Sequence, residues 1–278
     1  MVLQRWVLLR STSRRLALAS VAMVFMSGSA LLHAETNPRQ VLRAVYGCIL
    51  NQHEMLTNFH LYASDPKDRV LNADFRKAHQ TSVDCSSNVR ADLEGLGYAQ
   101  AATEISSSQE RLEKTVQYNA DSIAQKGVPE NAVVAEMVQH ELALVAALSQ
   151  AASGMVSSGK IKEVAEARQA RDLAVLIEYA NARYIERTTQ LYPRDDSAEP
   201  TIDDLATRFN AGINALRVSK RLTPELKKKV ESVNTRFRFI NGSLRNYNQN
   251  TVPFTVNRHT KSMVILLNEV ASSLEGTK

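Results

Sequence analysis

Apolar residues recur at intervals of three and four positions in several long stretches of the chain. This spacing places them on one face of an α-helix, where they can pack against a neighbouring helix. Sustained alternation of apolar and polar residues, which would favour β-strands, is not found, so the pattern predicts an all-α protein. The three clearest apolar sets are Val41, Val45, Cys48, Ile49, Met55, Leu56 and Phe59; Val133, Met137, Leu142, Val145 and Leu148; and Val164, Leu173, Leu176, Ala180, Tyr184 and Leu191.

Proline and glycine residues separate these stretches. Thr223, Pro224 and Glu225 form a helix start, with a capping hydroxyl, a proline in the first turn and an acid that favours the helix dipole. The short gaps between stretches indicate antiparallel neighbours. Helix ends are predicted at Gly97, Gly127, Gly154 and Gly159, with the alternative that Gly154 and Gly159 bend one long helix. The eight predicted helices span residues 38–62, 72–96, 99–125, 130–153, 160–191, 202–219, 223–248 and 253–274.

Turn and boundary residues repeat in the same order in both halves of the chain. The repeated pairs are Leu61-Tyr62 with Leu191-Tyr192, Asp74-Phe75 with Asp204-Leu205, Tyr118-Asn119 with Tyr247-Asn248, and Val128-Pro129 with Val252-Pro253. An ordered series of this kind indicates a tandem duplication, although unrelated amphipathic helices also resemble one another. The sequence therefore predicts two tandem antiparallel four-helix units, residues 35–154 and 155–278.

The first 34 residues have the features of a cleaved signal peptide. Four arginines and no acid precede the apolar run LALASVAMVF, and small residues follow it. The run is short of the roughly 20 residues that a membrane-spanning helix needs. We expect cleavage after Ala34, with Ala30 as the alternative, and a location in the periplasm. No later stretch is expected to span a membrane.

The charge of the chain changes once this leader is removed. The full chain carries a net charge of +5, but the part after residue 34 has 30 basic and 29 acidic residues. The basic pI therefore gives no support for nucleic-acid binding. Charge is unevenly distributed, however, with a net −8 over residues 35–207 and a net +10 over residues 208–261.

The basic segment predicts a surface that attracts an anionic partner. Its candidate residues are Arg217, Lys220, Arg221, Lys227, Lys228, Lys229, Arg236, Arg238 and Arg245. The candidate partners are an acidic envelope protein, anionic lipid or a cell-wall polymer. Two simpler interpretations stay open: a solvated helix face, or docking of the basic half on the acidic half.

Two cysteines, Cys48 and Cys85, lie after the leader. In an antiparallel hairpin of the first two predicted helices they would lie opposite each other, because their midpoint falls in the turn SDPKD. An oxidising compartment favours pairing, so we predict a disulfide; two buried free thiols are the alternative.

Sequence motifs for catalysis are absent. The chain has no GxSxG, HExxH, CxxC or phosphate-binding glycine loop. His53, His60 and His79 do not have the spacing of a metal site and are expected to be solvated or half-buried. We therefore expect no enzyme activity, no metal and no cofactor.

The stretch RFRFINGSLRNYNQNTVPFTVNRHTKSM, residues 236–263, is the least generic part of the sequence. It resembles the end of the periplasmic helical domain of type IV pilus methyl-accepting chemotaxis transducers and their stand-alone exported relatives. The resemblance implies a helical sensory bundle that binds a small ligand or a partner. The family's first-helix motif, of the type Gly-x-Gln-Arg-Met-Leu-Ser-Gln-Arg, is missing from GCILNQHEML (47–56) and VLIEYANARY (175–184), so no binding residue is carried over.

Asn246, Tyr247 and Asn248 offer amides and a phenol at one end of the predicted seventh helix. They are either a ligand-facing end of the bundle or a helix terminus, where asparagine is favoured over the helix interior. Taken together, the sequence predicts a soluble periplasmic binding or interaction module, accessory to an envelope signalling system. The alternative is a small-ligand sensor domain with an interhelical pocket.

Overall fold

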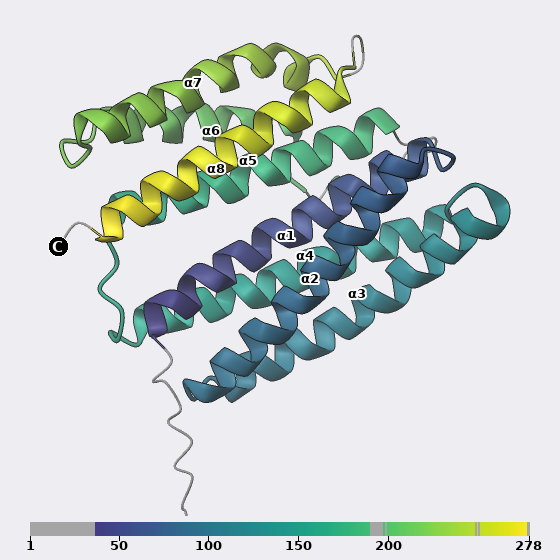
Figure 1. Ribbon diagram of the computed structural model, residues 1–278, viewed down its shortest axis with the longest axis horizontal. Helices are drawn as coiled ribbons and strands as arrows, with labels where there is room; N and C mark the ends of the chain where they lie inside the picture. Colours follow the sequence, from purple (N-terminus) through teal and green to yellow (C-terminus); the bar gives the residue numbers. More distant parts are fainter. Residues whose placement is uncertain (1–36, 190–196, 198, 248, 250, 277–278) are drawn as a thin grey trace, which may run out of the picture. The chain divides into compact units, whose positions relative to one another are not determined.

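The computed structural model describes residues 37–189, 197, 199–247, 249 and 251–276. This part of the chain forms eight α-helices and contains no strand, which confirms the predicted all-α class (Figure 1). The helices are α1 (Pro38–Ser64), α2 (Arg69–Gly95), α3 (Ala99–Lys126), α4 (Asn131–Ser157), α5 (Ala165–Thr189), α6 (Ile202–Arg217), α7 (Pro224–Arg245) and α8 (Pro253–Gly276).

Polar side chains before several helices satisfy the first backbone N–H groups. The Asp68 carboxylate accepts hydrogen bonds from the amides of Val70 and Leu71 at 2.7 and 3.2 Å. Thr201 and Asp204 form a reciprocal capping box at the start of α6. These caps explain why the sequence signals located most helix starts to within a few residues.

The largest boundary error lies between α4 and α5. Gly154 was expected to end a helix, but α4 continues through it to Ser157, and Gly159, with a φ of 74°, follows. A left-handed φ favours glycine at such a helix end, and Gly154 is not in that conformation. α5 begins at Ala165 instead of residue 160.

The eight helices pack as two four-helix bundles with the same connectivity. In the first bundle α1 contacts α2 and α4, and α3 contacts α2 and α4. In the second, α5 contacts α6 and α8, and α7 contacts α6 and α8. The bundles are joined by contacts between α1 and α5, and residues Glu35–Lys278 form one compact unit.

α1 and α5 are consequently the central helices of the protein, and Figure 1 shows them in the middle, with α2 and α3 on one side and α7 on the other. α1 buries 16 of its 27 residues and α5 buries 14 of its 25, whereas α2 buries 6 of 27 and α7 buries 7 of 22. α3 lies diagonally across the first bundle from α1, and α7 lies diagonally across the second bundle from α5. α3 and α7 are therefore the outermost helices of their bundles.

α5 and α6 approach each other closely at Gly212. A Cβ atom at this position would lie 2.6 Å from Leu173 Cδ2, so a larger residue would force the Leu173 side chain to move. The Gln169 side-chain amide donates a 3.0 Å hydrogen bond to the Gly212 carbonyl and fixes the same contact.

α4 is long and apolar enough to cross a membrane by length and composition, with a mean hydropathy of 1.4 over its best window. This differs from the expectation that no segment after the leader has these properties. In the structure α4 packs against α1 and α3. Val134, Met137, Leu144 and Leu148 are among the residues that it buries, so its apolar composition contributes to the core of the first bundle.

Candidate functional site

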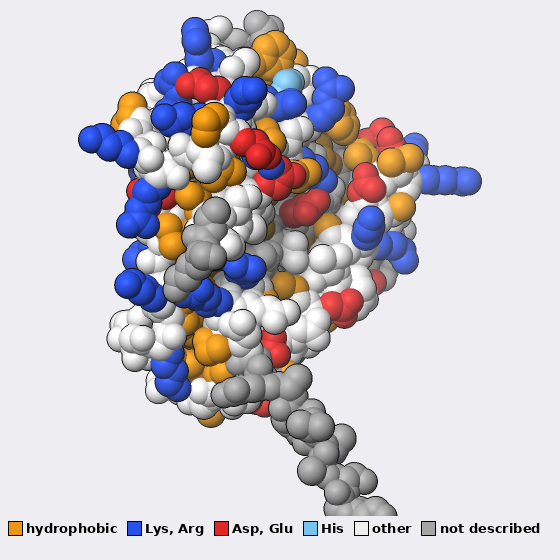
Figure 2. Space-filling model, turned by 60° about the vertical axis from the view of Figure 1, so that its left-hand side comes forward, with side chains coloured by type: hydrophobic (Ala, Val, Ile, Leu, Met, Phe, Trp, Pro, Cys, Tyr) orange, Lys and Arg blue, Asp and Glu red, His pale blue; other side chains and the backbone are white. Residues whose placement is uncertain are grey.

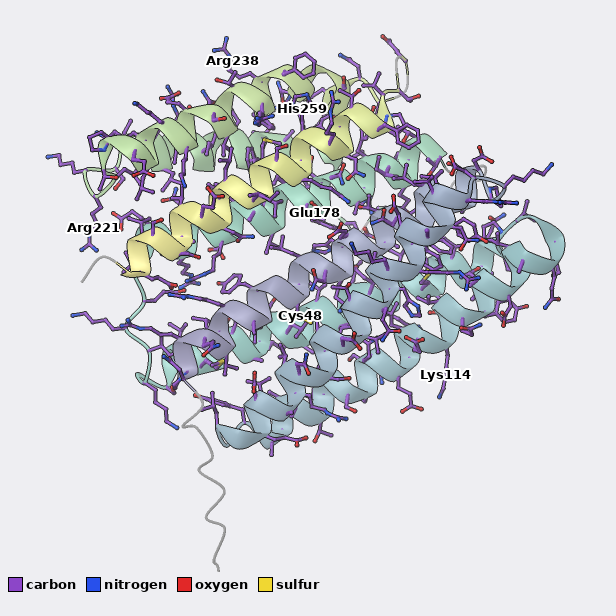
Figure 3. All side chains as sticks on the ribbon, in the orientation of Figure 1. Cys48, Lys114, Glu178, Arg221, Arg238 and His259 are labelled. Carbon is purple, nitrogen blue, oxygen red and sulfur yellow. The ribbon has the colours of Figure 1, made fainter. Side chains whose placement is uncertain are left out.

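The predicted basic residues lie along α6, α7 and the turn between them. Figure 2 shows Lys and Arg side chains projecting from the upper part of the face drawn, at the height of α7 in Figure 1. Figure 3 places Arg221 at the α6–α7 turn and Arg238 on the outer side of α7. The sequence therefore located a real concentration of positive charge, because a charged run on an outermost helix stays at the surface.

Four of the nine predicted basic residues form ion pairs within the chain. The pairs are Arg217 with Glu231 at 2.8 Å, Arg221 with Glu166 at 3.7 Å, Lys229 with Glu269 at 2.7 Å, and Arg245 with Asp203 at 3.3 Å. All are at least partly exposed, so each contributes at most about 1 kcal/mol. Arg221 and Arg245 match the interpretation in which the basic half docks on the acidic half, because Glu166 and Asp203 belong to residues 35–207. Arg217 and Lys229 pair with acids outside that half.

The remaining basic residues on α7 have no such partner. Among the described residues, no acid lies within ion-pair distance of Lys227, Lys228 or Arg238, and all three are exposed. Phe239 lies on the same outer side of α7 with 66 % of its surface exposed. A large aromatic side chain left in water beside unpaired cations is typical of an interaction surface.

The first half of α8 extends this surface. The Phe239 and His259 rings lie 4.7 Å apart, and Phe254 is 61 % exposed. Burial, followed by the positive charges of Arg236 and Arg258, lowers the pKa of His259. The two arginines make the surroundings of His259 electropositive. We call Lys227, Lys228, Arg236, Arg238, Phe239, Phe254, Arg258 and His259 the basic face.

Asn246 and Tyr247 lie at the C-terminal end of α7. Asn246 is the C-cap residue, with its amide bonded to the Gly242 carbonyl at 3.0 Å, and Tyr247 packs against the core while half-buried. Asn248 lies outside the described residues. The hypothesis of a ligand-facing end stays a prediction.

The two cysteines are free thiols in the structure, so the predicted disulfide is not formed here. Cys48 is buried on α1 (Figure 3), where its Sγ lies 3.6 Å from Ser86 Oγ and 3.8 Å from Gln52 Nε2. The two thiols nevertheless interact. The Cys85 thiol lowers the pKa of Cys48, and contact with Cys48 together with burial raises the pKa of Cys85. The prediction of adjacency across the α1–α2 hairpin was therefore more accurate than the prediction of the bond.

Sequence reasoning missed a set of ionised side chains at the junction of the bundles. Arg171 on α5 is 4 % exposed and pairs with Glu163 at 3.2 Å and with Glu275 of α8. Glu275 also pairs with Arg43 of α1 at 2.6 Å, so one carboxylate joins three helices. The Arg171 guanidinium lies 5.4 Å from the centre of the Tyr46 ring, which adds a cation–π contact.

A second buried set lies further along α1 and α5. His53 and Glu141 approach to 2.6 Å with side chains 2 % and 0 % exposed, so His53 is not solvated as expected. Glu178, which Figure 3 places near α1 and α8, has its pKa raised to about 7 by burial, followed by the charge of Glu54. Asn181 donates hydrogen bonds to Glu178 at 3.4 Å and to Asn257 at 3.1 Å.

The described residues contain no group of three His, Cys, Asp or Glu side chains that could hold a metal ion. Comparisons of the chain with protein families, with curated proteins and with solved structures found no match in any of the three. The resemblance to the periplasmic domain of chemotaxis transducers therefore stays a prediction from the sequence.

Proposed function

We propose that the protein is an exported interaction module that binds an anionic phospholipid surface through the basic face. The observation that carries this proposal is the combination, on the outermost helix α7, of unpaired cations with the exposed ring of Phe239. Juxtamembrane lysines and arginines each contribute about 1 kcal/mol near an anionic membrane. Exposed aromatic and aliphatic side chains add apolar contact with the headgroup and acyl boundary.

Lipid is favoured over an acidic protein because the apolar residues of this surface are scattered along two helices instead of forming one concave pocket. Phe239 on α7 and Phe254 on α8 are 66 % and 61 % exposed. Each can insert separately into a fluid boundary, whereas a protein interface has a packed core surrounded by a rim. Periplasmic location, the accessory role in envelope signalling and the transducer resemblance belong to the same proposal and rest on the sequence.

Vesicle co-sedimentation tests the proposal. The protein after Ala34 is mixed with vesicles of phosphatidylglycerol and phosphatidylcholine or of phosphatidylcholine alone. We expect binding to the anionic vesicles only, weakening as salt increases. The triple substitution Lys227→Gln, Lys228→Gln and Arg238→Gln removes about 3 kcal/mol, which is about a 100-fold loss of affinity.

The matched control removes three exposed cations from the corresponding outer helix of the first bundle, through Arg111→Gln, Lys114→Gln and Lys126→Gln. The overall charge change is the same, but these cations lie on α3, where Lys114 and Lys126 are paired with Glu110 and Glu130, and this control should keep most of the affinity. An equal loss in both triple variants, or equal binding to both vesicle types, contradicts the proposal. Capture of an acidic protein without vesicle binding would assign the basic face to a protein partner instead.

A further inference from the structure

A groove of about 410 Å³ lies where the two bundles meet, between α1, α4, α5 and α6. Its volume is within the range of roughly 300–1,000 Å³ that small-molecule sites occupy. It is separate from the basic face, which lies on α7 and α8. Because its lining comes from both bundles, a molecule bound here would contact both halves of the protein.

The long walls of the groove are apolar. They are built from Ile49 of α1, Leu142, Val145 and Ala152 of α4, and Val175 and Leu176 of α5. α1 and α5 are the buried central helices, so this apolar strip is an opening into the shared core. An aliphatic or aromatic body lying along it would remove apolar surface from water at about 25 cal/mol per Å².

One end of the groove is electropositive. Arg168 of α5 and Arg208 of α6 line it together with Asp172. Arg168 Nε lies 3.7 Å from Asp172 Oδ2, while Asp172 Oδ1 also accepts a 3.2 Å hydrogen bond from the Tyr46 hydroxyl. Among the described residues no acid lies within ion-pair distance of Arg208, which is exposed. Arg168 Nε also lies 3.9 Å from Glu163 Oε2, so Arg168 is shared between two carboxylates, and Arg208 is the cation at this end that has no acidic partner among the described residues.

The other end of the groove is polar but internally paired. His53 contacts Glu141 at 2.6 Å, and the Tyr179 hydroxyl donates a 3.1 Å hydrogen bond to Glu199. The His53 and Tyr179 rings lie 5.1 Å apart and close the groove. A charged ligand group at this end would have to displace contacts that already exist, whereas at the arginine end it would gain a contact with Arg208, which has no acidic partner among the described residues.

We infer that this groove binds a small anionic amphiphile, with its carboxylate between Arg168 and Arg208 and its apolar body along α1, α4 and α5. Arginine suits this role because its planar guanidinium donates two parallel hydrogen bonds to a carboxylate. The same chemistry is offered by medium-chain fatty acids and by aryl-alkyl carboxylic acids. The inference does not depend on lipid-surface binding by the basic face.

Isothermal titration calorimetry with two soluble probes tests the inference, namely decanoate below its micelle-forming concentration and 4-phenylbutyrate. Saturable one-to-one binding of either probe is expected. Tighter binding of decanoate would indicate a fatty-acid ligand, and tighter binding of 4-phenylbutyrate would indicate an aryl-alkyl carboxylic acid. Decanol, which has the apolar body without the charge, and acetate, which has the charge without the body, should both bind at least 10-fold more weakly.

Two variants locate the site. Arg208→Gln removes one cation from the rim of the groove. It should weaken carboxylate binding about 10-fold to 100-fold, which is the range for a hydrogen bond to a charged group. The affinity for decanol should not change. Ser149→Trp fills the groove from the exposed face of α4, where, within the described part of the chain, the Ser149 hydroxyl donates its hydrogen bond to the Val145 carbonyl of its own helix at 2.8 Å. It should abolish binding of both probes.

Arg111→Gln on α3, outside the groove, is the matched control and should bind like the unmodified protein. Circular dichroism and unfolding curves establish that each variant is folded. Absence of saturable binding for both probes overturns the inference. Undiminished binding in a folded Arg208→Gln or Ser149→Trp variant also overturns it, because the carboxylates would then be held elsewhere.

Discussion

The two bundles share one connectivity but differ in how their equivalent helices carry charge. On the outermost helix of the first bundle, α3, exposed charges are matched along the helix, as in the 2.8 Å pair between Lys114 and Glu110. On α7, the equivalent helix of the second bundle, Lys227, Lys228 and Arg238 have no acidic partner among the described residues. The same connectivity therefore permits different surfaces, because an outermost helix needs only one apolar stripe.

The central helices α1 and α5 differ instead in the side chains that they bury. Positions 130 residues apart, the spacing of the repeated Leu-Tyr, include His53 of α1 and Arg183 of α5. Both carry a basic side chain buried against a carboxylate, since His53 contacts Glu141 and Arg183 contacts Glu199. The same spacing relates Val41 to Arg171 and Cys48 to Glu178. At these last two positions the second bundle buries a charged type of side chain, Arg171 or Glu178, where the first bundle buries Val41 or Cys48.

The largest expected effect comes from breaking the buried ion pairs of α5. Arg171→Met leaves Glu163 and Glu275 buried without their main partner, and should lower the free energy of unfolding by about 3–5 kcal/mol. Arg43→Met, which removes the 44 % exposed partner of the same Glu275, should cost no more than about 1 kcal/mol. Urea denaturation of both variants measures the difference. Equal small losses would mean that the α5 pairs are no more important than surface pairs.

Oxidising the thiol pair should strengthen the first bundle by a comparable amount. Oxidised glutathione accepts two electrons and two protons from Cys48 and Cys85, and the bond formed would close a loop of roughly 36 residues, worth about 3–4 kcal/mol in the chain-entropy model. Non-reducing mass spectrometry detects the loss of two hydrogens, and denaturation measures the gain. A mixed glutathione adduct on Cys85 without the internal bond would show that the thiols cannot pair.

Glu178 should give the second bundle a pH dependence. Its pKa is about 7 in the folded protein, against 4.5 as the ordinary value, so the folded state binds the proton more tightly. The stability it contributes is complete below about pH 4.5 and is lost as the pH rises to about 7. Glu178→Gln should therefore be more stable than the unmodified protein by up to about 3 kcal/mol at pH 8, and equal to it near pH 4.

The matched control for this effect is Glu110→Gln on exposed α3, which should change stability little at either pH. Denaturation midpoints across pH 4–8 provide the measurement. A constant difference between Glu178→Gln and the unmodified protein over this range would assign the effect to packing instead of titration.

The smallest effect is expected at the surface of the first bundle. Lys114→Gln removes the exposed pair with Glu110, with side chains 72 % and 70 % exposed, and should cost about 0.5 kcal/mol or less at low salt and nothing measurable at high salt. A loss above about 1 kcal/mol in denaturation curves would show that charge matching on α3 contributes to stability as well as to surface character.

The fold was predictable because its determinants are local. The caps at Thr201 and Thr223, the left-handed glycines at 97 and 127 and the apolar spacing on α1 act within one or two helical turns. The basic face was partly predictable, since α7 carries a dense run of cations. Which of them are neutralised was not, because Lys229 and Arg245 find their acids on α8 and α6, far away in sequence.

The buried charges of α5 were invisible for the same reason. Arg171, Glu178 and Glu186 read as solvated residues when each helix is considered alone, and they become buried only because α5 is enclosed by α1, α6 and α8. The stretch EYANARYIE, residues 178–186, carries alanine, tyrosine and isoleucine on all sides of the helix. A helix that is apolar on all sides is enclosed by other helices, and this pattern is the sequence signal that its charged residues are buried.

Hydrogen exchange followed by mass spectrometry tests most directly whether α1 and α5 together form the centre of one two-bundle protein. The account predicts that amides of Pro38–Ser64 and Ala165–Thr189 exchange slowest of all, at similar rates, and that α3 and α7 exchange faster. If the charged helix α5 instead exchanges as fast as α7 while α1 stays protected, the second bundle is not built around α5 and the account is contradicted.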